Sequence, residues 1–219
     1  MLPPIVRDAL ADALSLAFPI ACAGCGEPGG PLCRSCGAEL EPHPRCRTLD
    51  GGLLVWSGLE YRGAAARALR ALKEEGRTGI ARDLAPALRA ALVAAGSGRR
   101  DLQVVPVPTS RAAMRRRGYR VVDLLVRRAG AQPLPLLRPA RRTADQRRLG
   151  RRARAANVEG SLRARSAAGL RVVVADDVVT TGATLQEAAR ALTEAGAHVV
   201  GAVTVASTPR LTSPGGIRA

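Results

Sequence analysis

Residues 172–184 read VVVADDVVTTGAT, a sequence that joins an apolar strand to two acids and a threonine-rich turn. The β-branched valines favour a strand buried on both faces, as in a parallel sheet. Asp176 and Asp177 follow at its expected carboxyl end, where open α/β sheets bind ligands. Residues 180–184 then offer backbone N–H groups, three hydroxyls and the positive end of a helix dipole, and Gly182 allows a close approach. We therefore predict a phosphate-binding loop at residues 180–184.

The rest of the chain alternates apolar strands with alanine-rich helices. Aromatic residues make up only 2% of the sequence, so the core must consist of Ala, Val and Leu. This alternation predicts an α/β fold in which helices cover both faces of a parallel sheet. We expect strands at 53–61, 102–107, 134–137, 170–175 and 198–206, and helices at 63–75, 80–95, 121–129 and 184–195, with a basic loop after the strand at 102–107.

The first fifty residues differ from the rest in composition. Residues 5–18 have the periodicity of a short amphipathic helix. Residues 19–50 are rich in Gly, Pro and Cys and lack the apolar runs needed to fold without a staple. We expect an N-terminal helix and a cysteine segment over residues 1–50, a main domain over 51–210 and a frayed tail over 211–219.

The chain is strongly basic, with a formal net charge of +16, and Lys73 is its only lysine. This charge favours anionic partners, whether phosphorylated small molecules or nucleic acid. A GC-rich genome would also explain the abundance of arginine, but not its clustering. One arginine cluster, at 115–117, follows the expected strand at 102–107, and the other occupies residues 138–154. Each cluster could bind pyrophosphate, form a solvated basic face or bind nucleic acid.

A phosphate loop alone cannot hold a multiply charged ligand. A helix dipole contributes only about 0.3–1 kcal/mol at an exposed site, whereas micromolar binding requires about 8 kcal/mol. We expect the two arginine clusters to supply the further cations. Because lysine is nearly absent, any cation in those loops must be arginine.

The order of apolar strand, paired acids and T-T-G-x-T resembles the binding motif for phosphoribosyl pyrophosphate (PRPP) in type I phosphoribosyltransferases, and every position of residues 172–184 matches it. The resemblance implies that Asp176 and Asp177 hold the 2- and 3-hydroxyls of ribose, with Mg²⁺ bridging the hydroxyls and the diphosphate. The 5-phosphate would lie on a loop made of Thr180, Thr181, Gly182, Ala183 and Thr184. These enzymes also close a mobile loop over the diphosphate. The candidate pyrophosphate contacts are Arg117, Arg142 and Arg154.

Several flanking motifs resemble ComF-family proteins. They are V-P-V-P at 105–108, R-R-R-G-Y at 115–119, Gln146-x-x-Leu149, Arg154-x-x-Asn157-Val158, Tyr61-Arg62-Gly63 and LRALKEEGR at 69–77. The resemblance extends over residues 20–208 and implies a cytoplasmic phosphoribosyltransferase-like protein, linked in some bacteria to the uptake of transforming DNA. The chain departs from the family at Arg120-Val121, where the family often has Asn-Gln. No role of those family side chains is therefore expected at these two positions.

Four cysteines form a paired C-x-x-C pattern: Cys22, Cys25, Cys33 and Cys36. Each pair closes a tight turn, and four thiolates complete a tetrahedral shell for structural Zn²⁺ that has no open position for chemistry. Disulfides are the alternative, but they are typical of secreted proteins, and nothing in the sequence suggests one. Cys46 reads as a remnant of a further C-x-x-C, although Cys46 or His43 could replace one of the four ligands.

Two functions follow from these features. In the first, the chain is an enzyme that transfers the phosphoribosyl group of PRPP to an unknown nitrogen acceptor, a base or an amine, and releases pyrophosphate. In the second, it is a non-catalytic PRPP-fold protein that acts in DNA uptake and competence through its basic loops and zinc knuckle. The paired acids favour retained PRPP binding, while the catalytic residues, the acceptor and the oligomeric state stay open. The sequence has neither a transmembrane segment nor a signal peptide, so we expect a cytoplasmic protein without membrane insertion.

Overall fold

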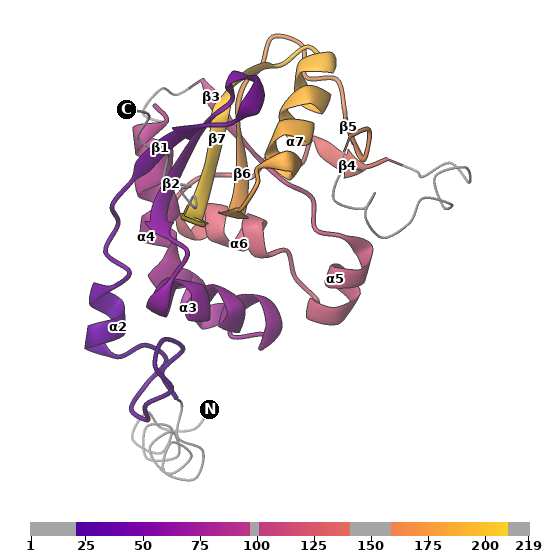
Figure 1. Ribbon diagram of the computed structural model, residues 1–219. Helices are drawn as coiled ribbons and strands as arrows, with labels where there is room; N and C mark the ends of the chain where they lie inside the picture. The colour runs from indigo at the N-terminus through magenta and orange to yellow at the C-terminus, as the bar shows by residue number, and fades with distance from the viewer. Residues whose placement is uncertain (1–20, 97–100, 141–158, 210–219) are drawn as a thin grey trace, which may run out of the picture.

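A mostly parallel five-stranded sheet runs through the residues that this computed structural model describes, 21–96, 101–140 and 159–209 (Figure 1). Its strand order is β1-β2-β7-β6-β3. From β2 to β3 the neighbouring strands in that order are parallel, and β1 pairs antiparallel with β2 at one edge. The strands are β1 (Arg45–Thr48), β2 (Leu54–Glu60), β3 (Leu102–Pro106), β6 (Arg171–Val179) and β7 (His198–Ser207). The predicted α/β fold is confirmed.

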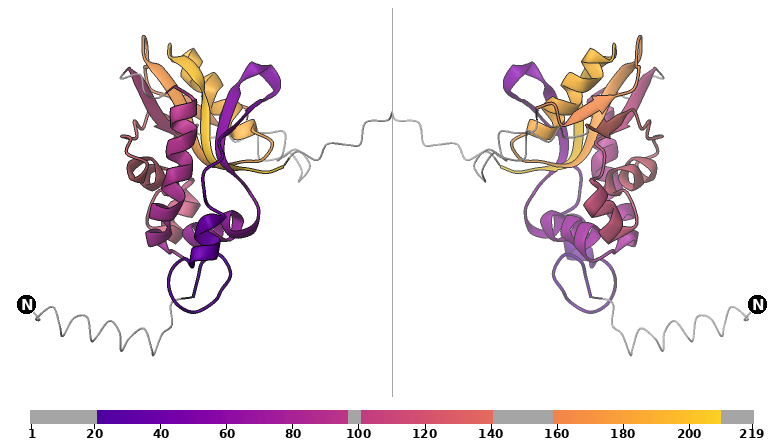
Figure 2. Two further views of the ribbon diagram at one scale, coloured as in Figure 1. Left: turned by 90° about the vertical axis from the view of Figure 1, so that its left-hand side faces the viewer. Right: turned by 90° about the vertical axis from the view of Figure 1, so that its right-hand side faces the viewer.

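Helices cover both faces of the sheet, as the side views in Figure 2 also show. One face packs against α4 (Ala81–Ala94) and α6 (Val121–Arg128), with α3 (Gly63–Glu74) beside them. The other face packs against α7 (Ala183–Glu194). None of the described helices is long and apolar enough to cross a bilayer.

The side chains of β6 alternate between the two cores. Val173 shares a core with α3, α4 and α6, whereas Val172 and Val174 share one with α7. All three valines are fully buried, which is what a central parallel strand requires. Because successive strand residues point to opposite faces, Asp177 continues on the side of α3 and Asp176 on the side of α7.

The prediction of a strand at 134–137 is wrong. Pro133 forms only an isolated bridge with Val104. The strand that does form, β4 (Leu137–Pro139), pairs antiparallel with β5 (Leu162–Ala164) in a separate two-stranded sheet. The N–H of Leu134 donates to the carbonyl oxygen of Val104 over 2.8 Å, but the N–H of Leu136 donates back to the carbonyl oxygen of Leu134, so the chain turns and the pairing with β3 does not continue.

Two regular elements extend into segments that were expected to be loops. The basic loop after β3 contains the helix α5 (Arg111–Arg117), in which the N–H of Ala113 donates to the hydroxyl of Ser110 over 3.2 Å. At the end of β6, the strand does not stop at Ala175 but continues to Val179. The two acids therefore belong to the strand itself and not to its exit.

Residues 19–50 also contain elements that the sequence did not predict. The helix α2 (Arg34–Ala38) begins directly after Cys33 and contains Cys36, and β1 adds an edge to the central sheet. Two short 3-10 helices, η1 (Asp50–Gly52) and η2 (Thr78–Ile80), complete the described elements. The expected helix at 5–18, the tail at 211–219 and the arginines Arg142 and Arg154 lie outside the described residues.

Candidate functional site

Two consecutive acids, Asp176 and Asp177, lie in the carboxyl-terminal half of β6. The backbone N–H of Asp177 donates to Oδ1 of Asp176 over 2.8 Å. Asp177 is buried, and Asp176 is half-buried opposite Thr204 of β7. Burying polar groups in a sheet costs free energy unless they find partners, so two adjacent acids here point to a ligand. They lie at the edge of the sheet where ligands of α/β proteins bind.

The carboxyl group of Asp176 is more shielded from water than the residue as a whole. Burial, together with the neighbouring Asp177 carboxylate, raises the pKa of Asp176 to about 7. The N–H of Asp177 and the ammonium of Lys73 act in the opposite direction. Near neutral pH Asp176 is therefore close to its titration midpoint, and a ligand that needs the carboxylate must displace a proton below that pH.

A lysine from a distant part of the chain completes this cluster. Lys73, in the last turn of α3, places its Nζ 2.8 Å from Oδ1 of Asp177, although the two residues are 104 positions apart. The side chain of Lys73 is 28% exposed and that of Asp177 is 13% exposed, so the ion pair is largely out of solvent. Reasoning from the sequence missed this residue, although its status as the only lysine was a signal.

The predicted phosphate loop, residues 180–184, forms the turn between β6 and α7. Its three threonines are exposed, whereas Gly182 is buried and adopts the left-handed conformation with φ 89°. Helix α7 begins at Ala183, so the first N–H groups of a 12-residue helix face the loop. The structure thus brings the predicted phosphate residues together next to the acid pair.

The segment after β1 covers this loop from one side. A Cβ atom on Gly182 would overlap the side chain of Leu49, so glycine is required there for space as well as for conformation. The guanidinium of Arg47 donates to the carbonyl oxygen of Thr180 over 2.7 Å, across 133 positions of sequence. The side-chain amide of Gln186 donates to the carbonyl oxygen of Asp50. Sequence reasoning found none of these contacts, because they join segments far apart in the chain.

A second loop follows the neighbouring strand β3. The N–H of Val107 donates to the carbonyl oxygen of Ala175 over 2.8 Å, which holds this loop against β6. Arg117, a predicted pyrophosphate contact, is half-buried in α5, and among the described residues its Nε is buried without a hydrogen-bond partner. Tyr119 packs behind it, where its hydroxyl donates to the carbonyl oxygen of Leu72 and burial raises the pKa of its phenol. The other two predicted contacts, Arg142 and Arg154, lie outside the described residues.

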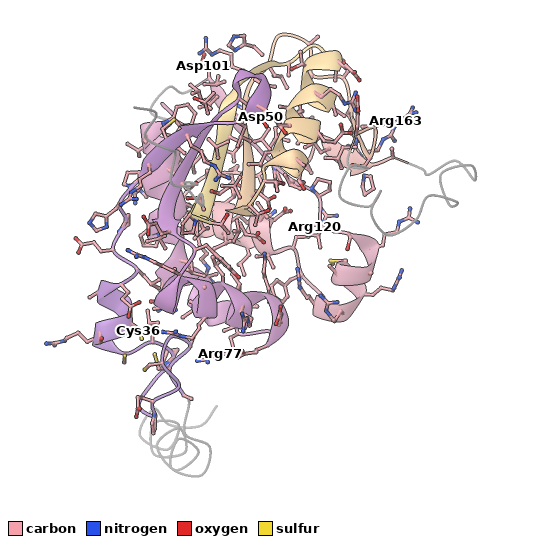
Figure 3. The ribbon with its side chains drawn as sticks, viewed as in Figure 1. Cys36, Asp50, Arg77, Asp101, Arg120 and Arg163 are labelled. Carbon is pink, nitrogen blue, oxygen red and sulfur yellow. The ribbon has the colours of Figure 1, made fainter. Side chains whose placement is uncertain are left out.

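A basic pocket of about 560 Å³ opens between α5 and β4. Its described lining contains five arginines and no acid. The arginines are Arg111, Arg115, Arg120, Arg138 and Arg165. Arg120 (labelled in Figure 3) also lies 3.7 Å from the carboxylate of Asp123. A concave surface of this charge suits a multiply charged anion.

The four predicted zinc ligands come together at one end of the molecule, where Figure 3 shows their sulfur atoms around Cys36. The sulfur atoms of Cys22, Cys25, Cys33 and Cys36 all lie within 4.8 Å of one another, and those of Cys25 and Cys33 are 3.7 Å apart. A tetrahedral zinc site with bonds of about 2.3 Å needs sulfur separations of roughly 3.8 Å, so the four thiols could hold Zn²⁺. Cys46 and His43 are not in this group of described residues; Cys46 lies in β1 opposite Trp56.

Local contacts already favour a thiolate at one of these cysteines. Burial opposes ionisation of Cys22, but hydrogen bonds from the backbone of Cys33, Cys25 and Gly24 lower the pKa of its thiol to about 6. Burial raises the pKa of the Cys36 thiol. A Cβ atom on Gly24 would overlap Cys36, so the first turn has room only for glycine.

The segment that carries the cysteines, residues 21–40 (the cysteine knuckle), is fastened to both ends of α3. At the start of the helix, the carboxylate of Glu39 accepts from the N–H of Ala64 over 2.9 Å, and Arg67 donates to the carbonyl oxygen of Gly24. Just beyond its end, Arg77 donates to the carbonyl oxygens of Ala21 and Pro31 over 2.6 and 3.2 Å. The knuckle therefore fixes the helix that carries the lysine of the acid cluster.

Comparison with known families supports a phosphoribosyltransferase-like fold. Residues 112–215 match the model of the phosphoribosyl transferase domain family, a span that includes the acid pair and the phosphate loop. No curated protein sequence matches the chain. The family match thus rests on the half of the chain that contains β6 and α7.

Solved structures similar to the chain include enzymes of nucleotide metabolism. The allosteric regulatory enzyme of purine biosynthesis is 23% identical with a TM-score of 0.35, over 57% of this chain and 25% of that one. An adenine phosphoribosyltransferase is 14% identical with a TM-score of 0.40, over 80% and 90% of the two chains. The orotate phosphoribosyltransferase from Aeropyrum pernix is 20% identical with a TM-score of 0.34, over 80% and 92%. The chain thus spans a quarter of the length of the first of these proteins and most of the other two.

Proposed function

We propose that the chain binds PRPP and transfers its phosphoribosyl group to a nitrogen acceptor, with release of pyrophosphate. The observation that carries this proposal is the position of the acid pair of β6 directly beside the phosphate loop at the start of α7. The loop would take the 5-phosphate on its N–H groups and threonine hydroxyls. Asp176 and Asp177 would accept hydrogen bonds from the two ribose hydroxyls.

The oxygen-rich lining also suits the Mg²⁺ that accompanies PRPP in such enzymes. Carboxylate oxygens of the acid pair and threonine hydroxyls are the hard donors that Mg²⁺ prefers. When bound, the ion would neutralise part of the charge on the diphosphate. The residues of this chain would do the rest, by holding the ribose and by keeping water away from the reacting carbon.

The transfer itself breaks one bond and forms another. The bond between C1 of ribose and the diphosphate oxygen breaks, and its electron pair leaves with the pyrophosphate. The lone pair of the acceptor nitrogen forms the new bond to C1, and the acceptor gives up its proton to solvent or to a base. Cations near the second loop, with Arg117 among them, would stabilise the departing charge.

A second candidate function is supported by the basic pocket and by the resemblance to the ComF family. In this alternative, the chain retains PRPP binding but acts as an accessory protein in the uptake of DNA. The five arginines of the pocket would then contact phosphates of a nucleic-acid backbone. The cysteine knuckle, with zinc bound, would serve as a structural part of either function.

Titration of the full-length protein with PRPP and Mg²⁺, followed by an assay of pyrophosphate release over a panel of bases and amines, tests the first proposal. We expect binding that Asp177→Asn abolishes and that Glu74→Gln, which removes an exposed carboxylate from α3, leaves unchanged. Wild-type protein that fails to bind PRPP would rule the proposal out. A gel-shift series at increasing salt tests the alternative, because contacts with nucleic-acid phosphates must weaken as salt rises.

A further inference from the structure

The ion pair between Lys73 and Asp177 is the only described contact of the chain's single lysine, and it is made to a proposed ligand-binding acid. The chain has 34 lysines and arginines, of which Lys73 is one, so the other 33 are arginine. Although arginine is far more common in this chain, the side chain that forms an ion pair with the acid pair in the described part of the chain is this lysine. Lysine presents a compact ammonium on a flexible stem, whereas the arginine head is a wide planar fork.

The acid pair needs a nearby cation. Asp176 and Asp177 are adjacent and partly desolvated, and two such carboxylates disfavour each other's charge. The charged groups that act on the carboxyl of Asp176 are Asp177 and Lys73, and only the lysine lowers its pKa. PRPP would bring further negative charge to the same edge of the sheet. Lys73, 2.8 Å from Asp177, is placed to offset part of this charge.

The helix that carries Lys73 is held from several sides. In Figure 1, α3 lies at the end of the sheet toward which the arrowheads of β6 and β7 point. One face of α3 is buried in the core, and the carbonyl oxygen of Leu72, next to the lysine, accepts from the hydroxyl of Tyr119. The cysteine knuckle fastens both ends of the helix through the Glu39, Arg67 and Arg77 contacts. Because its helix is fixed by these contacts, the backbone of Lys73 holds the ammonium near Asp177.

We propose that Lys73 is a positioning residue of the PRPP site, whose ammonium holds the Asp177 carboxylate in the orientation that receives the ribose hydroxyls. This inference rests on the proposed function and adds a residue to it that lies outside the PRPP motif. The ammonium orients and neutralises the carboxylate and takes no part in proton transfer. The ion pair with Lys73 also explains how an acid in a largely apolar strand can stay charged and oriented to bind a ligand.

The test is PRPP binding measured by calorimetry between about pH 5.5 and 8.5 for four full-length proteins. They are the wild type, Lys73→Met, Lys73→Arg and the control Arg70→Met. Arg70 is exposed on the same helix and forms no ion pair with the acids in the described part of the chain, so its replacement removes the same charge without breaking that contact. We expect Lys73→Met to weaken PRPP binding about tenfold or more, as the loss of a charged hydrogen bond does. We also expect it to move the pH at which binding is half-maximal upward, because Lys73 lowers the pKa of Asp176 and its loss removes that effect.

The remaining variants separate positioning from general effects. Lys73→Arg should return the pH midpoint toward the wild-type value because it restores the charge, and Arg70→Met should match the wild type in affinity and midpoint. Zinc content and melting temperature of each variant check that the fold is kept. Unchanged affinity and midpoint in Lys73→Met would overturn this inference alone, as would an equal loss in Arg70→Met. A wild-type protein that binds no PRPP would overturn the inference together with the proposed function.

Discussion

Leu49 packs directly onto Gly182, so a residue that follows β1 covers one side of the phosphate loop. Two residues earlier in the loop, the carbonyl oxygen of Thr180 accepts a hydrogen bond from Arg47 of the same segment. The shape of the loop therefore depends on residues outside the span that matches the phosphoribosyl transferase domain model. Mutations on either side of this contact should disturb ligand binding.

We expect Gly182→Ala to abolish PRPP binding. The new methyl group overlaps Leu49, and φ 89° strains any residue with a Cβ atom by about 1–3 kcal/mol. Gly130→Ala is a matched control, since Gly130 has the same φ of 89° but open space around its Cβ position. Both variants should melt at lower temperature, and only Gly182→Ala should lose the ligand in calorimetry. Equal PRPP affinity in the two variants would contradict the role of the loop.

PRPP binding should strengthen as the pH rises toward neutrality. The pKa of Asp176 is about 7 in the ligand-free protein, so below that pH the ligand must displace a proton from the carboxyl group. At pH 6 we expect a net release of protons on binding, which is measured by calorimetry in two buffers with different heats of ionisation. Identical heats in both buffers would show that no proton leaves and that this acid is already charged.

Asp176→Asn should stabilise the ligand-free protein at alkaline pH while it weakens PRPP binding. The folded state raises the pKa of Asp176 from 3.8 to about 7, so the charged form is disfavoured by folding. Stability from this group is present below about pH 4 and is lost as the pH rises to about 7. At pH 8 removal of the charge should raise the melting temperature by about 4–8 °C, if the gain is about 2 kcal/mol. At pH 4 wild type and variant should melt alike, and a difference that does not depend on pH would argue for another cause.

The cysteine knuckle should contain one zinc ion per chain. Removal of the metal with a strong chelator should expose four thiols and lower the melting temperature, because a structural zinc site contributes directly to folding. Cys36→Ser should lose the metal. Cys46→Ser is the matched control, since Cys46 is exposed in β1 outside the sulfur cluster, and it should keep its zinc by elemental analysis. Full zinc content in Cys36→Ser would show that the cluster is not the ligand set.

The sequence predicted the strand–loop–helix unit of β6 and α7 because its signals are local. A valine run, two acids and a glycine-containing turn specify each part within residues 172–184. The paired C-x-x-C spacing likewise predicted the group of four sulfurs. In both cases the residues that meet in space are close in the sequence.

The residues that complete the site could not be predicted in this way. Lys73 and Asp177 are 104 positions apart, and Arg47 and Thr180 are 133 positions apart, so only the packing of helices and sheet brings them together. The short strand β1 has no apolar alternation to reveal it, because three of its four residues are exposed. The error at 134–137 had a different origin: the leucines suggested a strand, but the chain turns at Leu136, whose N–H donates to the carbonyl oxygen of Leu134 instead of to β3.

The attachment of the cysteine knuckle to both ends of α3 has a thermodynamic consequence. Metal bound at one end of the helix and ligand bound beside Lys73 at the other would act on the same rigid element. Coupling between two binding equilibria is reciprocal, so any factor by which zinc raises the affinity for PRPP is also the factor by which PRPP raises the affinity for zinc. A chain saturated with PRPP would then need a higher concentration of chelator to lose its metal than a chain without PRPP.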